Sequence, residues 1–149
     1  GKTLAWPVVD KDDASDCLMH HLNSYGALAY EIMFRQAQTL LAQGFSVIVD
    51  SPLRSQLGLD NAVRIATAEN VNLNVLDCFC SDQLLWKNRL ETRIRRPAHI
   101  LKTWQDFERY WQTAAQDFEY PLNVPFLKMD MRTPVAENVA RVLTWLEPY

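Results

Sequence analysis

Aspartates directly follow two short apolar stretches of this sequence. The string "VVDKDD" spans residues 8–13, and "VIVDSP" spans residues 47–52. Carboxylates bind Mg²⁺, and a carboxylate can also accept the proton of an attacking hydroxyl group. If both stretches are parallel strands, their aspartates project from one edge of a sheet, where ligands bind in open α/β folds. The pattern indicates metal-assisted group transfer, although aspartates after strands also serve simply as turn formers or helix N-caps.

The chain starts with Gly1-Lys2-Thr3, which matches the last three letters of the phosphate-binding loop G-x-x-x-x-G-K-[ST]. In such a loop, backbone amides and the lysine hold phosphates, while the hydroxyl group helps to bind Mg²⁺. We therefore expect Gly1, Lys2 and Thr3 to bind a nucleotide at the start of a helix. Thr3 and Asp50 would then hold the metal, and Asp12 would be the general base. A match of three residues also arises easily by chance.

Positive charge concentrates in one part of this acidic chain. Residues 82–102 contain six Lys or Arg residues and two acidic residues, a net charge of +4, whereas the rest of the chain carries −7. Three of the arginines, Arg93, Arg95 and Arg96, stand just before Pro97. We expect them to lie on a lid that closes over a bound triphosphate and stabilises transition-state charge. The alternative is a solvated cluster that complements a helix dipole.

Short continuous apolar runs, typical of buried strands, alternate along the chain with segments whose apolar residues recur at helical spacing. This alternation predicts an α/β fold with a parallel sheet. Strands are predicted at residues 6–10, 45–50, 72–79 and 125–130. Helices are predicted at residues 30–41, 57–69 and 103–118, after Ser81 as an N-cap, and from Thr133-Pro134 onward. Residues 18–30 and 118–125 are loop-like and aromatic, and are candidate specificity elements.

Length and composition limit the other possibilities. With 149 residues, 48% of them hydrophobic, the chain is expected to form one domain over residues 1–149, with a lid around residues 91–102. The net charge of −3 disfavours nucleic acid as a partner. No apolar run is long enough to span a membrane, and no signal peptide is visible, so we expect a cytoplasmic protein. The three cysteines are expected to be buried.

Taken together, the strings "VVDKDD", "GFSVIVDSPL" and "LLWKNRLETR" resemble those of small P-loop kinases, the zeta-toxin and polynucleotide-kinase-like group of AAA family ATPases. The resemblance implies a three-layer P-loop NTPase fold with strand order 2-3-1-4-5, and ATP and Mg²⁺ as cofactors. It implies that Asp12 is the general base and Asp50 the metal-site aspartate. It also implies that Arg93, Arg95 or Arg96 is the functional lid arginine.

The sequence departs from this family at its start. Family members have a central strand and a complete loop before the position of Gly1, and a full helix where this chain has only Leu4 and Ala5 before Trp6. Loss of a central strand would leave a gap of about 10 Å in the sheet. Either the natural protein contains residues before Gly1 and between Ala5 and Trp6, or the sheet pairs across the gap. We expect the first, because the other motifs keep the order that they have in the family.

The sequence therefore predicts an ATP-dependent, Mg²⁺-dependent kinase that acts on a small hydroxyl-bearing acceptor of unknown identity. The alternative is a nucleotide-binding switch, or a catalytically inactive interaction module on the same fold. A kinase for nucleic-acid ends is a third possibility, which the overall acidity disfavours.

Overall fold

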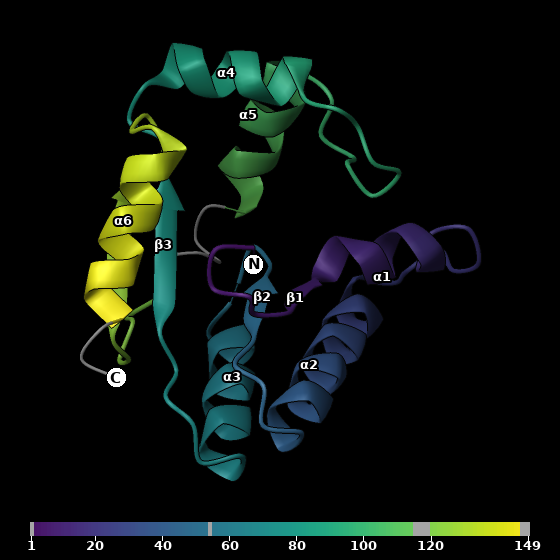
Figure 1. The fold of residues 1–149 in the computed structure, drawn as a ribbon. Coiled ribbons are helices and arrows are strands. Elements are labelled where there is room, and N and C mark those ends of the chain that lie inside the picture. Colours follow the sequence, from purple (N-terminus) through teal and green to yellow (C-terminus); the bar gives the residue numbers. More distant parts are fainter. Residues whose placement is uncertain (1, 54, 115–119, 147–149) are drawn as a thin grey trace. The chain divides into compact units, whose positions relative to one another are not determined.

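The computed structural model describes residues 2–53, 55–114 and 120–146, and these residues divide into two compact units (Figure 1). Unit 1 comprises Gly1–Asn72, Arg95–Ile100 and Thr113–Tyr120. Unit 2 comprises Leu73–Ile94, Leu101–Gln112 and Pro121–Tyr149. Each unit is built on its own pair of strands, and each is considered separately below.

Unit 1 consists of two parallel strands and three helices. Its elements, in chain order, are β1 (Val8–Asp10), α1 (Lys11–Leu18), α2 (Gly26–Ala42), β2 (Ile48–Asp50) and α3 (Gln56–Ala68). Val8, Val9 and Asp10 pair in register with Ile48, Val49 and Asp50. This register places Asp10 opposite Asp50 at the carboxyl ends of the two strands.

The core of unit 1 forms where α2 packs against β1 and α3. Buried Val9, Met33, Phe34 and Ile65 make up this cluster. Ala29, Met33 and Ala37 are all nearly inaccessible to solvent and recur every four residues, which is the spacing of one helix face. After α2 the chain turns at Gly44, whose φ of +85° favours glycine, and continues toward β2. The core thus fixes the two strand ends relative to each other.

Helix α1 starts at the end of β1 because Asp10 caps it. The Asp10 Oδ1 atom accepts a hydrogen bond of 2.8 Å from the Asp12 amide, and Asp12 and Asp13 in the first turn complement the helix dipole. The cap therefore holds Asp12 and Asp13 next to the end of β1.

Unit 2 also contains two parallel strands and three helices. Its elements are β3 (Val75–Phe79), α4 (Gln83–Thr92), α5 (Trp104–Ala114), β4 (Phe126–Asp130) and α6 (Val135–Leu146). β3 and β4 pair from Val75 with Phe126 to Phe79 with Asp130. Figure 1 shows α6 alongside the strands of this unit, and α6 contacts β4.

Aromatic side chains hold α4 and α5 together in unit 2. The Trp86 ring lies with its centroid 4.7 Å from that of Phe107 and 5.7 Å from that of Trp104, in edge-to-face geometry. Phe107 also stacks on Trp111 at 5.7 Å. These rings therefore pack mainly on one another, as expected for helix-packing residues.

The fold class agrees with the sequence prediction. The described residues form six helices and four strands, and both strand pairs are parallel. Within the described residues β1 pairs with β2 and β3 with β4, and no strand pairing joins the two pairs. None of the helices in this part of the chain has the length and apolar character needed to cross a membrane.

Several local predictions were wrong. Residues 2–5 form a turn, in which the Ala5 amide bonds the Lys2 carbonyl, and not the first turn of a helix. Helix α1 was not predicted, and α2 begins within residues 18–30, for which the sequence predicts a loop. Asp82, whose carboxylate accepts from the Leu85 amide, caps α4 in place of Ser81.

Other predictions differ in detail or lie partly outside the described residues. Each strand is shorter than expected at its start. The predicted helix 103–118 is observed as α5, and residues 115–119 are outside the described residues. Cys17 and Cys78 are exposed and Cys80 is half-buried, so the expectation of buried cysteines was also wrong.

Candidate functional site

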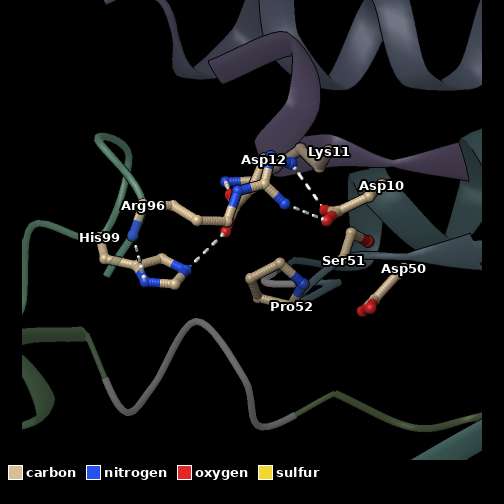
Figure 2. A pocket seen from close by; sticks show the side chains of 8 residues that line it. All are labelled: Asp10, Lys11, Asp12, Asp50, Ser51, Pro52, Arg96 and His99. Atoms are coloured by element: carbon tan, nitrogen blue, oxygen red, sulfur yellow. Dashed lines mark hydrogen bonds and ion pairs between the residues drawn. The ribbon is translucent and has the colours of Figure 1, made fainter. Parts of the chain in front are cut away.

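The carboxyl ends of β1 and β2 open into a pocket of about 460 Å³ within unit 1 (Figure 2). Strand β1 and the start of α1 supply three of its residues, and β2 with the turn after it supplies three more. A segment distant in sequence, 95–100, supplies the last two. The lining residues are Asp10, Lys11, Asp12, Asp50, Ser51, Pro52, Arg96 and His99.

Asp50 is the acidic residue of this pocket for which the described residues supply no hydrogen-bond or ion-pair partner. Within the described part of the chain, its carboxylate makes no hydrogen bond or ion pair, and Figure 2 shows no interaction between it and the other side chains drawn. Partial burial, together with the nearby charges of Asp10 and Asp12, raises the pKa of Asp50, while Arg96 opposes the shift.

Arg96 binds the N-cap aspartate of α1 and two aspartates within this helix. Its Nη1 atom lies 2.6 Å from Asp10 Oδ2, its Nη2 atom 2.6 Å from Asp13 Oδ1, and its Nε atom 2.8 Å from Asp16 Oδ2. The three aspartates are spaced by three residues, which places them along one side of the capped helix. Hydrogen bonds that Arg96 donates to these three carboxylates, first of all to Asp16, raise the pKa of Arg96 above its ordinary value.

Asp16 also holds the backbone of the segment that carries Arg96. Its Oδ1 atom accepts a hydrogen bond of 2.6 Å from the Ala98 amide. Burial alone would raise the pKa of Asp16, but the hydrogen bonds from Ala98 and Arg96 outweigh it and lower the pKa. The segment is thus attached to α1 through both side-chain and backbone contacts.

Asp12 lies between a lysine and a histidine. Its Oδ1 atom is 2.7 Å from Lys11 Nζ, and its Oδ2 atom is 3.6 Å from His99 Nε2. The side chains of Asp12 and His99 are 28% and 16% exposed, so both are shielded but Asp12 remains accessible from the pocket. Figure 2 shows the imidazole directed toward this carboxylate.

The structure brings together only some of the predicted site residues. Asp12, Asp50 and Arg96 line one pocket. Lys2 and Thr3 lie in an exposed turn and are not among the described residues that line the pocket, and Gly1 is outside the described residues.

The other two lid arginines differ from Arg96. Arg95 is exposed in the same segment of unit 1. Arg93 belongs to unit 2, where it follows the last residue of α4 and its Nη2 atom lies 3.4 Å from the Leu101 carbonyl oxygen. Among the three arginines, Arg96 alone lines the acidic pocket within the described residues.

The chemistry of the pocket is compatible with Mg²⁺. In the described ranges, no group of three or more Asp, Glu, His or Cys side chains is arranged to bind a metal. Mg²⁺ in nucleotide enzymes usually needs only one or two carboxylates, because water and substrate phosphates supply the other ligands. The unpartnered Asp50 carboxylate and the neighbouring Ser51 hydroxyl are oxygen donors of the required type.

Sequence reasoning missed Asp16 and His99. The spacing of Asp10, Asp13 and Asp16 would have revealed an arginine-binding side of α1 had the helix been recognised. The sequence around His99 contains no comparable pattern, because only the tertiary structure brings His99 to Asp12. His99 lies in a short turn, in which its amide donates to the Arg96 carbonyl at 3.0 Å.

Comparisons with known proteins agree with this fold. No family model matches the chain, and no curated protein matches it. Among solved structures, the chain is similar to the crystal structure of a "putative kinase" from Chloroflexus aurantiacus j-10-fl, with a TM-score of 0.69 and 21% sequence identity. The match covers 99% of this chain and 85% of the other. This likeness shows a kinase-like α/β fold.

Proposed function

We propose that this protein is an ATP-dependent phosphotransferase that transfers the γ-phosphoryl group to a hydroxyl-bearing acceptor. The observation that carries the proposal is the meeting of Asp12, Asp50 and Arg96 in one pocket at the carboxyl ends of two parallel strands. This is the region where open α/β folds bind their ligands. The fold shared with the Chloroflexus protein supports the same class of activity.

Asp12 is the general base in this proposal. The acceptor hydroxyl gives its proton to the Asp12 carboxylate as its oxygen bonds to the γ-phosphorus. The bond between that phosphorus and the β–γ bridging oxygen then breaks, and ADP leaves with the bonding electron pair. Most of the rate in such reactions comes from positioning and charge stabilisation, and less from the base itself.

Asp50 is the proposed metal-site aspartate, and the neighbouring Ser51 hydroxyl lines the same pocket. A contribution from the Thr3 hydroxyl as a second oxygen donor requires the exposed turn 2–5 to approach this pocket. Mg²⁺ would neutralise phosphate charge in the nucleotide. An unpaired carboxylate with a raised pKa suits this role, because cation binding removes the repulsion from Asp10 and Asp12. Gly1 and Lys2 are proposed to hold the phosphates through the backbone amide and the ammonium group.

Arg96, Arg95 and Arg93 are the proposed sources of positive charge for the triphosphate. Arg96 reaches the pocket but is bound to three carboxylates. A role in phosphate binding therefore requires that Arg96 exchange at least one aspartate for a phosphate oxygen. Arg95, which is exposed one residue earlier, takes no part in those three ion pairs and is the second proposed source of positive charge.

The same binding of Arg96 favours a second candidate function, a nucleotide-binding switch without catalysis. If the ion pairs of Arg96 are permanent, the segment 95–100 stays attached to α1 and the arginine never reaches a transition state. In that case nucleotide would bind at the pocket but no product would form.

Phosphoryl transfer from γ-labelled ATP tests the proposal. The protein is incubated with ATP and Mg²⁺ and a panel of small alcohols, aminoglycosides, nucleosides and 5′-hydroxyl oligonucleotides. We expect label in one acceptor class, dependent on Mg²⁺ and absent with the Asp12→Asn variant. ATP binding without label in any acceptor would favour the switch, and the absence of ATP binding would contradict both functions.

A further inference from the structure

We propose that His99 is a positioning residue for Asp12, the general base of the phosphotransferase proposed above, and this inference rests on that function. His99 lies far from Asp12 in the sequence. Its imidazole nevertheless faces the Asp12 carboxylate, with Nε2 at 3.6 Å from Oδ2. The role follows from how the segment is held, which ring nitrogen carries the proton, and what this proton does to the carboxylate.

The segment 95–100 is held rigidly enough to position an imidazole. Arg96 uses three guanidinium nitrogens on three carboxylates at 2.6–2.8 Å, and the Ala98 amide bonds Asp16 at 2.6 Å. An arginine fork distributed over several carboxylates fixes orientation better than a single ion pair does. The residues before and after His99 are therefore attached to α1, the helix that also carries Asp12.

The hydrogen bonding of His99 determines its tautomer. The Arg96 amide donates to His99 Nδ1 at 3.1 Å, so Nδ1 is an acceptor and carries no proton. In the neutral ring the proton must then be on Nε2, which is the nitrogen nearest Asp12. The backbone of the Arg96 turn thus directs an N–H group at the carboxylate.

A neutral His99 can orient Asp12 but cannot receive its proton. Nε2 already carries a hydrogen, and Nδ1 is occupied by the Arg96 amide. The proton taken from the acceptor hydroxyl therefore remains on Asp12 until Asp12 releases it to solvent through the pocket. The ring lies beside one carboxylate oxygen at 3.6 Å, and Lys11 pairs with the other at 2.7 Å.

Protonation of His99 has a different effect. An imidazolium beside Asp12 stabilises the negative charge of the carboxylate and makes it a weaker base. Asp12 and Asp16 on α1 face the ring and favour its charged form, whereas Arg96 on the same segment opposes it. Lys11, the partner of the other Asp12 oxygen, adds to that opposition. The site should therefore lose activity when the ring becomes charged.

Imidazole NMR tests the geometry without any nucleotide. In ¹⁵N-labelled protein, we expect the His99 ring to show the Nε2–H tautomer at high pH. We also expect its titration midpoint to move to lower pH in the Asp12→Asn variant. The exposed His20, followed in the same spectra, should not move. An Nδ1–H tautomer, or a His99 midpoint unchanged by Asp12→Asn, would overturn the pairing.

Rates of phosphoryl transfer from ATP with Mg²⁺, measured with the acceptor panel described above, test the consequence for Asp12. His99→Gln keeps a donor near Asp12 but cannot be charged, and His99→Phe removes the donor. At pH 8 we expect His99→Gln to be close to wild type, and His99→Phe to be slower by about 10-fold to 100-fold, as is typical when an orienting partner is removed.

The pH dependence separates positioning from a structural role. Between pH 8 and pH 6 the wild-type rate should fall more steeply than the His99→Gln rate, because only the wild type can form an imidazolium. His20→Gln is the matched control and should follow the wild type. Parallel wild-type and His99→Gln profiles, or an unchanged His99→Phe rate, would overturn the inference. If neither the wild type nor any variant uses ATP, the proposed function fails. The NMR result alone then decides whether His99 positions Asp12.

Discussion

The two units place an aspartate at the same position of their strand pairs, but the two side chains have opposite surroundings. Asp50 ends β2 opposite Asp10, and Asp130 ends β4 opposite Phe79. The pKa of Asp50 is raised, mainly through partial burial and neighbouring carboxylates. The pKa of Asp130 is strongly lowered, chiefly because the Ser81 hydroxyl bonds it, followed by the amide and side chain of Arg132.

The partners of Asp130 identify it as a structural residue. Its Oδ1 atom accepts from the Ser81 amide at 3.3 Å and from the Arg132 amide at 3.0 Å. Its Oδ2 atom accepts from the Ser81 hydroxyl and from Arg132 Nε. These bonds join the chain after β3 to the chain after β4, and they leave little capacity for a ligand.

The comparison teaches that an aspartate after a strand is not by itself evidence of a site. Both aspartates look alike in the sequence. In "VIVDSP" and in "FLKMDM", an Asp follows a mainly apolar stretch. The partners distinguish them, because a carboxylate with all its lone pairs bonded stabilises the fold, whereas an unpartnered one beside like charges can bind a cation. The predictions below test this distinction.

The largest expected effect is on catalysis, from Asp12→Asn. Removal of the general base should lower the rate of phosphoryl transfer by about 10²-fold to 10⁴-fold. ATP affinity should change little, because Asp12 acts on the acceptor. Rates with labelled ATP and binding by calorimetry measure the two separately. Asp60→Asn on the exposed surface of α3 is the control, and a loss of ATP binding in Asp12→Asn would contradict the assigned role.

The paired variants Asp50→Asn and Asp130→Asn should differ most in stability. Asp130→Asn removes a carboxylate with four hydrogen bonds and should lower the thermal midpoint. Asp50→Asn relieves repulsion and should change the free energy of unfolding by no more than about 0.5 kcal/mol. Calorimetric melting of both variants measures the contrast. Equal destabilisation by the two substitutions would show that Asp50 also has a structural role.

Arg96→Ala should release the segment 95–100 from α1. Hydrogen exchange of the Ala98 amide should become faster by about 10-fold, since local opening no longer requires three ion pairs to break. Arg95→Ala, which removes the exposed neighbouring arginine, is the matched control. Unchanged exchange at Ala98 would show that the Asp16 bond alone holds the segment.

A smaller effect is expected in the pH dependence of stability. The pKa values of Asp16 and Asp130 are lowered in the folded protein, so both carboxylates stabilise it above about pH 4, the ordinary pKa of Asp. That contribution is lost as the pH falls toward their folded values. Asp50 has the opposite sign: its raised pKa means that ionisation opposes folding at neutral pH and that acid relieves the penalty.

Urea unfolding between pH 2 and pH 7 measures this prediction. Asp130→Asn should flatten the loss of stability below pH 4, whereas Asp50→Asn should remove a small gain on moderate acidification. An acid-induced loss of stability that is the same in wild type and Asp130→Asn would contradict the assignment of Asp130.

The sequence predicted the strands and their parallel pairing because buried β-branched residues and following helices impose that arrangement. It also located Asp12 and Asp50 at one strand edge. It did not predict α1, because "KDDASDCL" is polar and Ser15 is its only buried residue among those described. That helix depends on the Asp10 cap more than on an apolar face.

The choice among the arginines also lay beyond the sequence. Arg93, Arg95 and Arg96 have the same chemistry, and only the position of the turn before His99 directs Arg96 to α1. Contacts between residues separated by 80 or more positions depend on tertiary structure, for which local patterns carry no signal. His99 was missed for the same reason.

Calorimetric titration of ATP with Mg²⁺ into wild type, Asp50→Asn and Asp130→Asn tests the central claim most directly. The account predicts Mg²⁺-dependent binding to the wild type and to folded Asp130→Asn, and a clear loss of that binding in Asp50→Asn. Absence of binding to the wild type, or equal affinity in Asp50→Asn and the wild type, would contradict the claim that the β1–β2 edge is the nucleotide site.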